Sequence, residues 1–368
     1  MNSQDASEPY TPPNGEQLKL LEEISAHLRG LSDADLYRFF TLTKWWVQCY
    51  ASGYELDGPL FLVLDNCIIQ DFKHRKTKAD RALKALAYTT FCRFVKGWSD
   101  RPTYLAVTAV AIYEHLGRKP VSSPHAASSV LSELKTLLAD TELSVTTIGF
   151  NNIQELQRLL HDVHEDANFL LQYVQEIDAA NWQCDLKAPI GVRIPMSIAC
   201  EAIPDNLPLK YFDPWYVKFV LESRIEQLII EHSQQNPDAM PIGCGEMSIA
   251  LSSLNEVSKK KLLKGLGDID LLQVCDINRQ YKQKIGYVLL GQTVDKGLAE
   301  VLRHRHTYHE SVGMTGGSPN ATEEISKMVN FMLSNPFAEQ DARRAIIRPK
   351  MADFLHELAT LCKSASIQ

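Results

Sequence analysis

The chain has 368 residues, a formal net charge of −7 and a hydrophobic fraction of 45%. This apolar content excludes a disordered chain, and the length favours two or three domains or one elaborated domain. The negative charge excludes a basic field over the whole protein as a means of binding nucleic acid. The eight cysteines form no Cys-x-x-Cys pair, so we expect reduced, mostly buried thiols rather than a zinc site.

Residues 1–57 predict a loose tail followed by a pair of helices. Residues 1–15 contain three prolines, which favour an irregular tail. Apolar residues then recur at helical spacing from Glu16 to about Tyr50. Ser32 and Asp33 are typical of the start of the second helix. The N-terminus lacks a signal pattern, and no window approaches the roughly 18 apolar residues of a membrane span. We therefore expect a cytoplasmic protein with no membrane partner.

Two apolar runs predict buried strands of a parallel sheet. LFLVLD covers 60–65, and IGYVLLGQTVD covers 285–295. Between them, residues 103–117 read as a strand and then a helix, and 144–150 admit a further short strand or turn. A basic helix is expected from about Lys73 to Lys96. Strands that alternate with helices predict a parallel sheet with helices on its faces, whose ligands bind beyond the carboxyl ends of the strands.

Acidic residues occur where such a sheet would bind a ligand. Asp65 and Asp295 close the two buried strand candidates, and Glu114 lies in an otherwise apolar helical segment. Asp268 and Asp270 follow the glycine turn 265–267, at an expected helix start. Converging carboxylates repel one another, and a hard divalent cation such as Mg²⁺ relieves that repulsion. Such a centre indicates metal-dependent hydrolysis of phosphodiester bonds.

In this order, the acids resemble those of the PIN-like nucleases. The closest local match is the Thr-x-Asp element TVDKGL at 293–298. The resemblance implies a three-layer α/β/α fold with a parallel sheet, and cleavage of RNA or DNA with Mg²⁺ or Mn²⁺. It implies that Asp65 is the first acid, Glu114 the second, Asp268 or Asp270 the third, and that Asp295 belongs to the Thr-x-Asp element.

The resemblance also sets the expected domain organisation. The PIN-like domain would span 58–312, with a helical insertion at about 120–260. A flexible loop and a helical C-terminal cap would follow at 313–368. Because the insertion separates Glu114 from the third acid, three other acids remain open as the second one: Glu133, Glu155 and Glu165.

Basic residues near these acids are candidates for contacts with phosphates. The stretch 73–101 is strongly basic, and a second group follows the last strand. The alternative is that these residues form solvated helix faces. The candidates are Lys73, Arg75, Lys76, Lys78, Arg81, Arg303 and Arg305.

The sequence thus predicts a metal-dependent nuclease acting on a nucleic acid, RNA in preference to DNA. The predicted metal ligands and catalytic residues are the same five acids. A regulatory protein partner and an oligomeric state are both compatible with the sequence. The alternative is a non-catalytic PIN-like interaction or regulatory protein, in which the helical additions form the binding surface.

Overall fold

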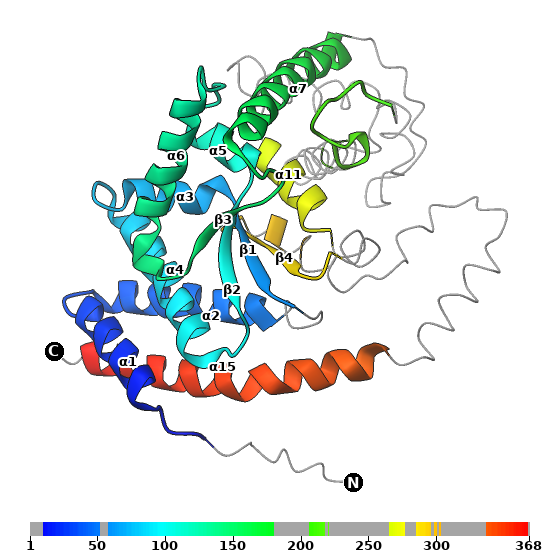
Figure 1. The fold of residues 1–368 in the computed structure, drawn as a ribbon. Coiled ribbons are helices and arrows are strands. Elements are labelled where there is room, and N and C mark those ends of the chain that lie inside the picture. The colour runs from blue at the N-terminus through cyan, green and yellow to red at the C-terminus, as the bar shows by residue number, and fades with distance from the viewer. Residues whose placement is uncertain are drawn as a thin grey trace, which may run out of the picture. The chain divides into compact units, whose positions relative to one another are not determined.

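The fold is given by a computed structural model (Figure 1). The structure describes residues 10–51, 58–179, 206–217, 220, 265–276, 285–295, 298–299, 302 and 336–366. The chain divides into two compact units. The first comprises Met1–Val107, Val130–Thr147 and Cys275–Gln368, and the second comprises Thr108–Ser129 and Ile148–Val274.

The first unit is a mixed α/β structure built on a parallel sheet. In the described part of the chain the sheet has four strands in the order β3-β2-β1-β4. The strands are β1 (Leu60–Leu64), β2 (Thr103–Val107), β3 (Val145–Thr147) and β4 (Val288–Gln292). This confirms the parallel sheet predicted from the sequence.

The central strand β1 shows why these residues form strands. Its Leu62 lies between Leu105 of β2 and Leu290 of β4, and all three side chains are buried. A strand covered on both faces needs apolar residues at consecutive positions rather than alternate ones. LFLVL meets that requirement, so the continuous apolar run is the signal that identifies the strand.

Helices of the first unit pack around a shared aromatic core. Trp46 of α2 packs its ring against Tyr88 and Phe91 of α4, with ring centroids 4.9 and 6.1 Å away. Helices α1 and α2 confirm the predicted N-terminal pair, and Ser32 caps α2 through the backbone N–H of Asp35. The helices are α1 (Gly15–Leu28), α2 (Asp33–Ala51), α3 (Asn66–His74), α4 (Ala79–Trp98) and the 3₁₀ turn η2 (Ala139–Thr141).

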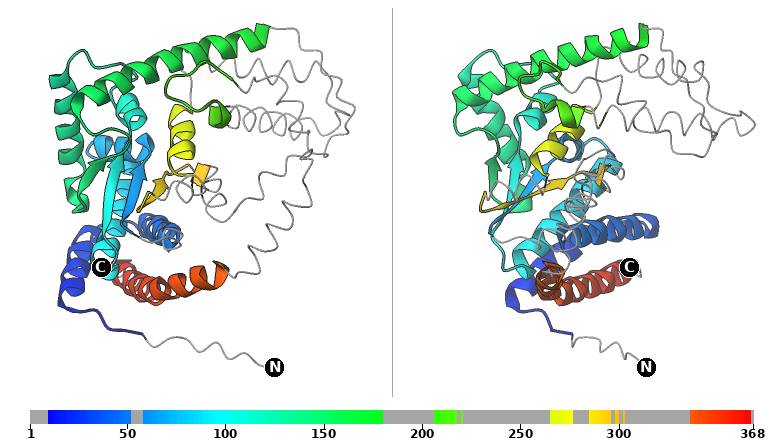
Figure 2. Two further views of the ribbon diagram at one scale, coloured as in Figure 1. Left: turned by 45° about the vertical axis from the view of Figure 1, so that its right-hand side comes forward. Right: turned by 90° about the vertical axis from the view of Figure 1, so that its right-hand side faces the viewer.

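The C-terminal helix α15 (Pro336–Ser366) closes this core from outside. It lies beside α2 in all three views of Figures 1 and 2 and also contacts α1 and α4. Phe354 is fully buried against Phe94 and Trp98. The helical C-terminal cap predicted from the sequence is therefore present from residue 336, and the loop expected at 313–320 lies outside the described residues.

In its described part, the second unit is helical. Helix α5 packs against both α7 and α11. The elements are α5 (Ala109–His115), α7 (Ile153–Ala179) and α11 (Leu266–Val274), with α6 (Pro124–Leu137) crossing from the second unit into the first. Most of the predicted insertion at 120–260 lies outside the described residues.

The structure corrects two expected elements. The basic helix expected from Lys73 to Lys96 is two elements, because α3 ends at His74 and α4 begins at Ala79. Helix α11 begins at Leu266, so Gly267 lies inside the helix and not in a turn before it. The local sequence was ambiguous at both points, since neither contains a proline to end a helix.

Candidate active site at the carboxyl edge of the sheet

The carboxyl ends of β1 and β4 form the topological switch point of the sheet. From β1 the chain proceeds to β2 and β3 on one side, and β4 then pairs with the opposite side of β1. In open parallel sheets, ligands bind outside the strands at such a reversal. Asp65 follows β1 directly, and Asp295 comes three residues after β4. The switch point therefore carries two of the five predicted acids.

Asp65 stands at the N-cap position of α3 but does not cap the helix. Its backbone is extended, and its side chain makes no capping hydrogen bond. Instead, Oδ2 accepts a hydrogen bond of 2.8 Å from the hydroxyl of Thr293, which follows β4. The Asp65 N–H donates to the carbonyl of Gln292 at 2.9 Å. The half-buried carboxylate of Asp65 is therefore oriented by the residue that follows β4, and it does not cap α3.

Thr293 links the two acids of the switch point. Its buried hydroxyl oxygen accepts the backbone N–H of Asp295 at 3.1 Å while its hydrogen is donated to Asp65. The exposed Asp295 uses Oδ1 to accept the N–H of Leu298 at 3.0 Å, which is a helix-capping contact. Asp295 therefore has a structural role, and its side chain is exposed to solvent.

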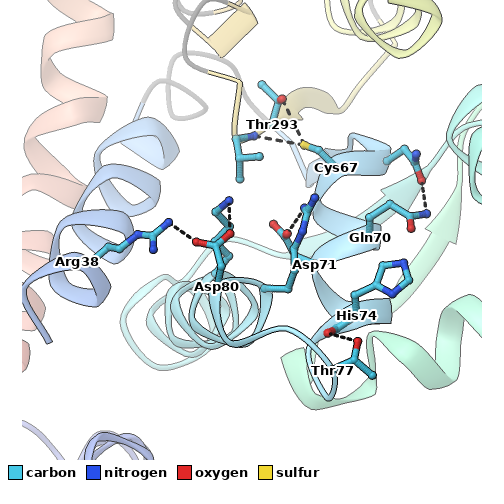
Figure 3. Close-up of polar contacts among 12 residues, drawn as sticks. Arg38, Cys67, Gln70, Asp71, His74, Thr77, Asp80 and Thr293 are labelled. Atoms are coloured by element: carbon cyan, nitrogen blue, oxygen red, sulfur yellow. Dashed lines mark hydrogen bonds and ion pairs between the residues drawn. The ribbon is translucent and has the colours of Figure 1, made fainter. Parts of the chain in front are cut away.

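Cys67 lies against the same threonine (Figure 3). Its Sγ is 3.5 Å from the Thr293 hydroxyl and accepts the N–H of Val294 at 3.4 Å. Burial raises the pKa of the Cys67 thiol well above its ordinary value, and the negative charge of Asp65 raises it further. A nucleophilic cysteine instead has a lowered pKa, so this environment does not activate the thiol. The sequence analysis missed this residue, although its position two residues after Asp65 was a usable signal.

Asp270, in the second unit, is a buried carboxylate held by two hydroxyls. Thr108 donates to Oδ2, and Tyr211 donates to Oδ1 at 2.8 Å. Thr108 also caps α5 through the N–H of Ala111, at 3.2 Å. Burial raises the pKa of Tyr211 well above its ordinary value, and the charge of Asp270 adds to the shift. Asp270 thus joins α11 to α5 and to the segment that carries Tyr211, a structural role that the sequence did not reveal.

The other two acids of the second unit differ in their surroundings. Asp268 lies in the first turn of α11 and is half-buried. Glu114 forms an ion pair with Arg118, four residues later and beyond the end of α5, at 2.9 Å, and its side chain is only 10% exposed. The first unit therefore holds Asp65 and Asp295 around Thr293, and the second unit holds Glu114, Asp268 and Asp270.

Two of the alternative second acids also have local partners. Glu155 accepts the N–H of Asn151 at 2.8 Å, before the start of α7. Glu165 pairs with Lys210 and, together with His161 and Asp162, offers ligand atoms within 4.8 Å of one another. The side chains of Lys210 and Glu165 are 58% and 40% exposed, so their ion pair is weak.

Ion pairs use much of the basic stretch that was expected to contact phosphates. Arg81 pairs with the buried Asp71, and Arg75 pairs with Asp140 at 2.8 Å. Three further pairs involve Lys84, Arg93 and Lys96. In contrast, Lys73 in the last turn of α3 and Lys76 and Lys78 between α3 and α4 are exposed. Arg303 and Arg305 lie outside the described residues.

Comparison with known proteins adds no family assignment. No family model matches the chain, and no match is found among curated proteins or solved structures. Among the helices that the structure describes, none has the length and apolar character needed to cross a bilayer. The function must therefore be argued from the residues of the site.

Proposed function

We propose that the chain is a metal-dependent nuclease that hydrolyses phosphodiester bonds, with RNA preferred to DNA. The observation that carries the proposal is the pair Asp65 and Asp295 at the switch point of the sheet, joined through Thr293. The order of the five acids supports it through the resemblance to PIN-like nucleases. A three-layer α/β/α arrangement, as in that family, is compatible with the parallel sheet β3-β2-β1-β4.

The donors at the switch point suit Mg²⁺ or Mn²⁺. Both ions prefer oxygen ligands and bind through one or two carboxylates while they keep several waters. Asp65 and Asp295 are the residues of the first unit that would hold such an ion. The ion would activate a water and neutralise charge on the phosphodiester. The chain's own contribution is to orient Asp65, which the Thr293 hydroxyl does.

A strand of RNA also needs cationic contacts that are not already neutralised. The exposed Lys73, Lys76 and Lys78 are the proposed phosphate contacts, since the arginines near them form ion pairs within the protein. These lysines would position the RNA whatever its base sequence, because a lysine that contacts a phosphate binds its charge and does not contact the bases.

The second candidate is a non-catalytic interaction protein, and a specific observation favours it. The acids of the predicted site already have protein partners: Asp65 accepts the Thr293 hydroxyl, Asp270 accepts two hydroxyls, Glu114 pairs with Arg118, and Asp295 caps a helix. A domain that has lost its metal would keep such contacts for stability. The two candidates differ in their response to divalent ions, because an ion that binds only the folded state must raise the melting temperature.

The experiment measures cleavage of labelled single-stranded RNA and DNA with Mn²⁺, beside melting with and without the ion. The variants are Asp65→Asn and, as a matched control on α15, a substitution of the half-buried Asp353, Asp353→Asn. We expect the wild type and Asp353→Asn to cleave RNA and to melt higher with Mn²⁺, and Asp65→Asn to do neither. Absence of cleavage together with absence of metal stabilisation in the wild type would favour the interaction protein.

A second pair of variants tests how Thr293 acts. Thr293→Ser keeps the hydroxyl that donates to Asp65, whereas Thr293→Val removes it at similar volume. We expect Ser to retain metal-induced stabilisation and Val to lose most of it. Equal behaviour of the two variants would show that the hydroxyl does not position Asp65 for the metal.

A further inference from the structure

A short segment of the second unit is fixed unusually firmly to α7. In residues 206–217, here called the strap, three consecutive N–H groups donate to the buried carboxylate of Asp166. Lys210 donates to Oδ1 at 2.9 Å, and Tyr211 and Phe212 donate to Oδ2 at 2.8 and 3.0 Å. Figure 2 shows the strap beside α7. One buried carboxylate thus sets the backbone of three residues.

A second set of contacts fixes the strap beyond that point. Asp213 donates its N–H to Oε1 of Gln273 on α11 at 3.1 Å, and its Oδ1 accepts the N–H of Trp215 at 3.0 Å. The backbone of Trp215 is therefore held in place through α7 and α11. Holding a tryptophan in this way removes the entropy that a mobile loop would lose on binding a ligand.

The indole that the strap holds is half exposed. Trp215 is 48% exposed, and its ring meets the buried ring of Tyr216 edge to face, with centroids 4.8 Å apart. A large aromatic surface fixed from behind and open to solvent is typical of the centre of a binding surface. The question is which class of ligand the surroundings favour.

The charges around the strap favour a cation. The part of α7 whose side chains are described carries Glu155, Asp162, Glu165 and Asp166, against one arginine, Arg158, and two histidines, His161 and His164. The strap adds Asp213, and its one lysine, Lys210, is paired with Glu165. That ion pair is solvent-exposed on both sides, so it is weak and can be exchanged. A phosphate-bearing ligand would be repelled here, and a guanidinium or ammonium would be attracted.

We propose that Trp215 and the acidic face of α7 bind an arginine- or lysine-rich segment of a protein partner. A guanidinium over the indole face gains a cation–π interaction, and carboxylates of α7 pair with flanking bases. Glu155 and Glu165 are ten residues apart on one helix, which is about 15 Å along its axis. That distance suits an extended basic peptide better than a single small cation. The site does not depend on the proposed nuclease activity.

The test measures binding of a fluorescein-labelled nona-arginine peptide to the full chain by anisotropy, without divalent ions, at low and at physiological salt. The variants are Trp215→Ala and the double variant Asp162→Asn/Glu165→Gln. The control is Tyr37→Ala, which removes a 75% exposed aromatic ring from α2 in the other unit. We expect Trp215→Ala to weaken binding about twofold to thirtyfold. The double variant should also weaken binding and flatten its salt dependence, and Tyr37→Ala should change neither.

Three results would overturn the proposal. The first is equal affinity of Trp215→Ala and wild type for the peptide, and the second is no measurable binding by the wild type. The third is a labelled single-stranded RNA that binds in a Trp215-dependent manner and displaces the peptide, which would assign the indole to base stacking. Thermal melts of all variants distinguish lost binding from lost folding. Because the assay contains no metal and measures no cleavage, its outcome is separate from that of the nuclease test.

Discussion

The ion pair of Arg81 with Asp71, which is labelled in Figure 3, tests whether part of the basic stretch 73–101 stabilises the fold. Asp71 of α3 has a side chain only 3% exposed, whereas Arg81 of α4 is 33% exposed. Burial raises the pKa of Asp71 above its ordinary value of 3.8, and the hydrogen bond from Arg81 opposes that rise. The guanidinium thus compensates a carboxylate that has lost most of its water.

Replacement of Arg81 by methionine keeps most of the side-chain volume and removes the charge. Breaking a buried ion pair from one side costs about 3–5 kcal/mol, because the remaining charge is buried without a partner. Water reaches the site through the exposed third of Arg81, so we expect a loss of about 2–4 kcal/mol in the free energy of unfolding. Asp71→Asn should cost less than Arg81→Met, because the partner left behind is an arginine that solvent can reach.

The assay is urea denaturation of the wild type, Arg81→Met, Asp71→Asn and the double variant. We expect the double variant to be more stable than Arg81→Met, since it leaves no buried charge. RNA binding measured on the same proteins separates the two roles of Arg81. If Arg81→Met has the same free energy of unfolding as the wild type but binds RNA more weakly, the ion-pair argument is refuted. Arg81 would then be a contact for RNA phosphates.

The pH dependence of this pair has a definite sign. A carboxyl group whose folded pKa is raised makes folding most favourable below the unfolded pKa, and this contribution is lost as pH rises through the folded pKa. For Asp71, stability falls with rising pH over the range from its ordinary pKa of 3.8 up to its raised pKa in the folded state. Removal of Arg81 raises that pKa further. The stability deficit of Arg81→Met should therefore shrink as the pH is lowered from neutral towards 4.

Two further substitutions test packing in the described core. Phe354→Ala removes a fully buried ring of α15 that lies 4.9 and 5.0 Å from two aromatic rings of α4, and should cost about 3–5 kcal/mol in urea denaturation. Ile346→Ala, 59% exposed on the same helix, should change stability by less than about 0.5 kcal/mol, and equal losses would contradict this packing. Gly58→Ala should destabilise more than Gly117→Ala in thermal melts. Both glycines have positive φ, but only at Gly58 would a Cβ approach the carbonyl oxygen of Gly286, to 2.3 Å.

The strands and the first acid of the site were readable from local sequence. A strand buried on both faces requires consecutive apolar residues, so LFLVL and the run around Val288 identified β1 and β4 without knowledge of their neighbours. Asp65 then follows from position alone, because the residue after such a strand lies at the carboxyl edge of the sheet. The N-terminal helix pair was likewise predicted from helical spacing.

The local sequence did not predict which charged residues form ion pairs within the protein. The sequence analysis counted the bases of residues 73–101, but Arg75 is neutralised by Asp140 and Arg93 by Glu23, both distant in the chain. Helix boundaries such as the break between α3 and α4 also depended on packing. A count of local charge therefore overstated the cationic surface available to a phosphate.

The sequence by itself determined the parallel sheet, because hydrophobic burial leaves a local pattern in each strand. Only the tertiary structure decided what each acid does. Asp65 is held by Thr293, which is 228 positions away, and Asp166 accepts N–H groups of Lys210 and Tyr211, which lie 44 and 45 positions later. Hydrogen bonds between side chains depend on distances of a few ångströms, and residues so far apart in the chain come within that range only when the core packs.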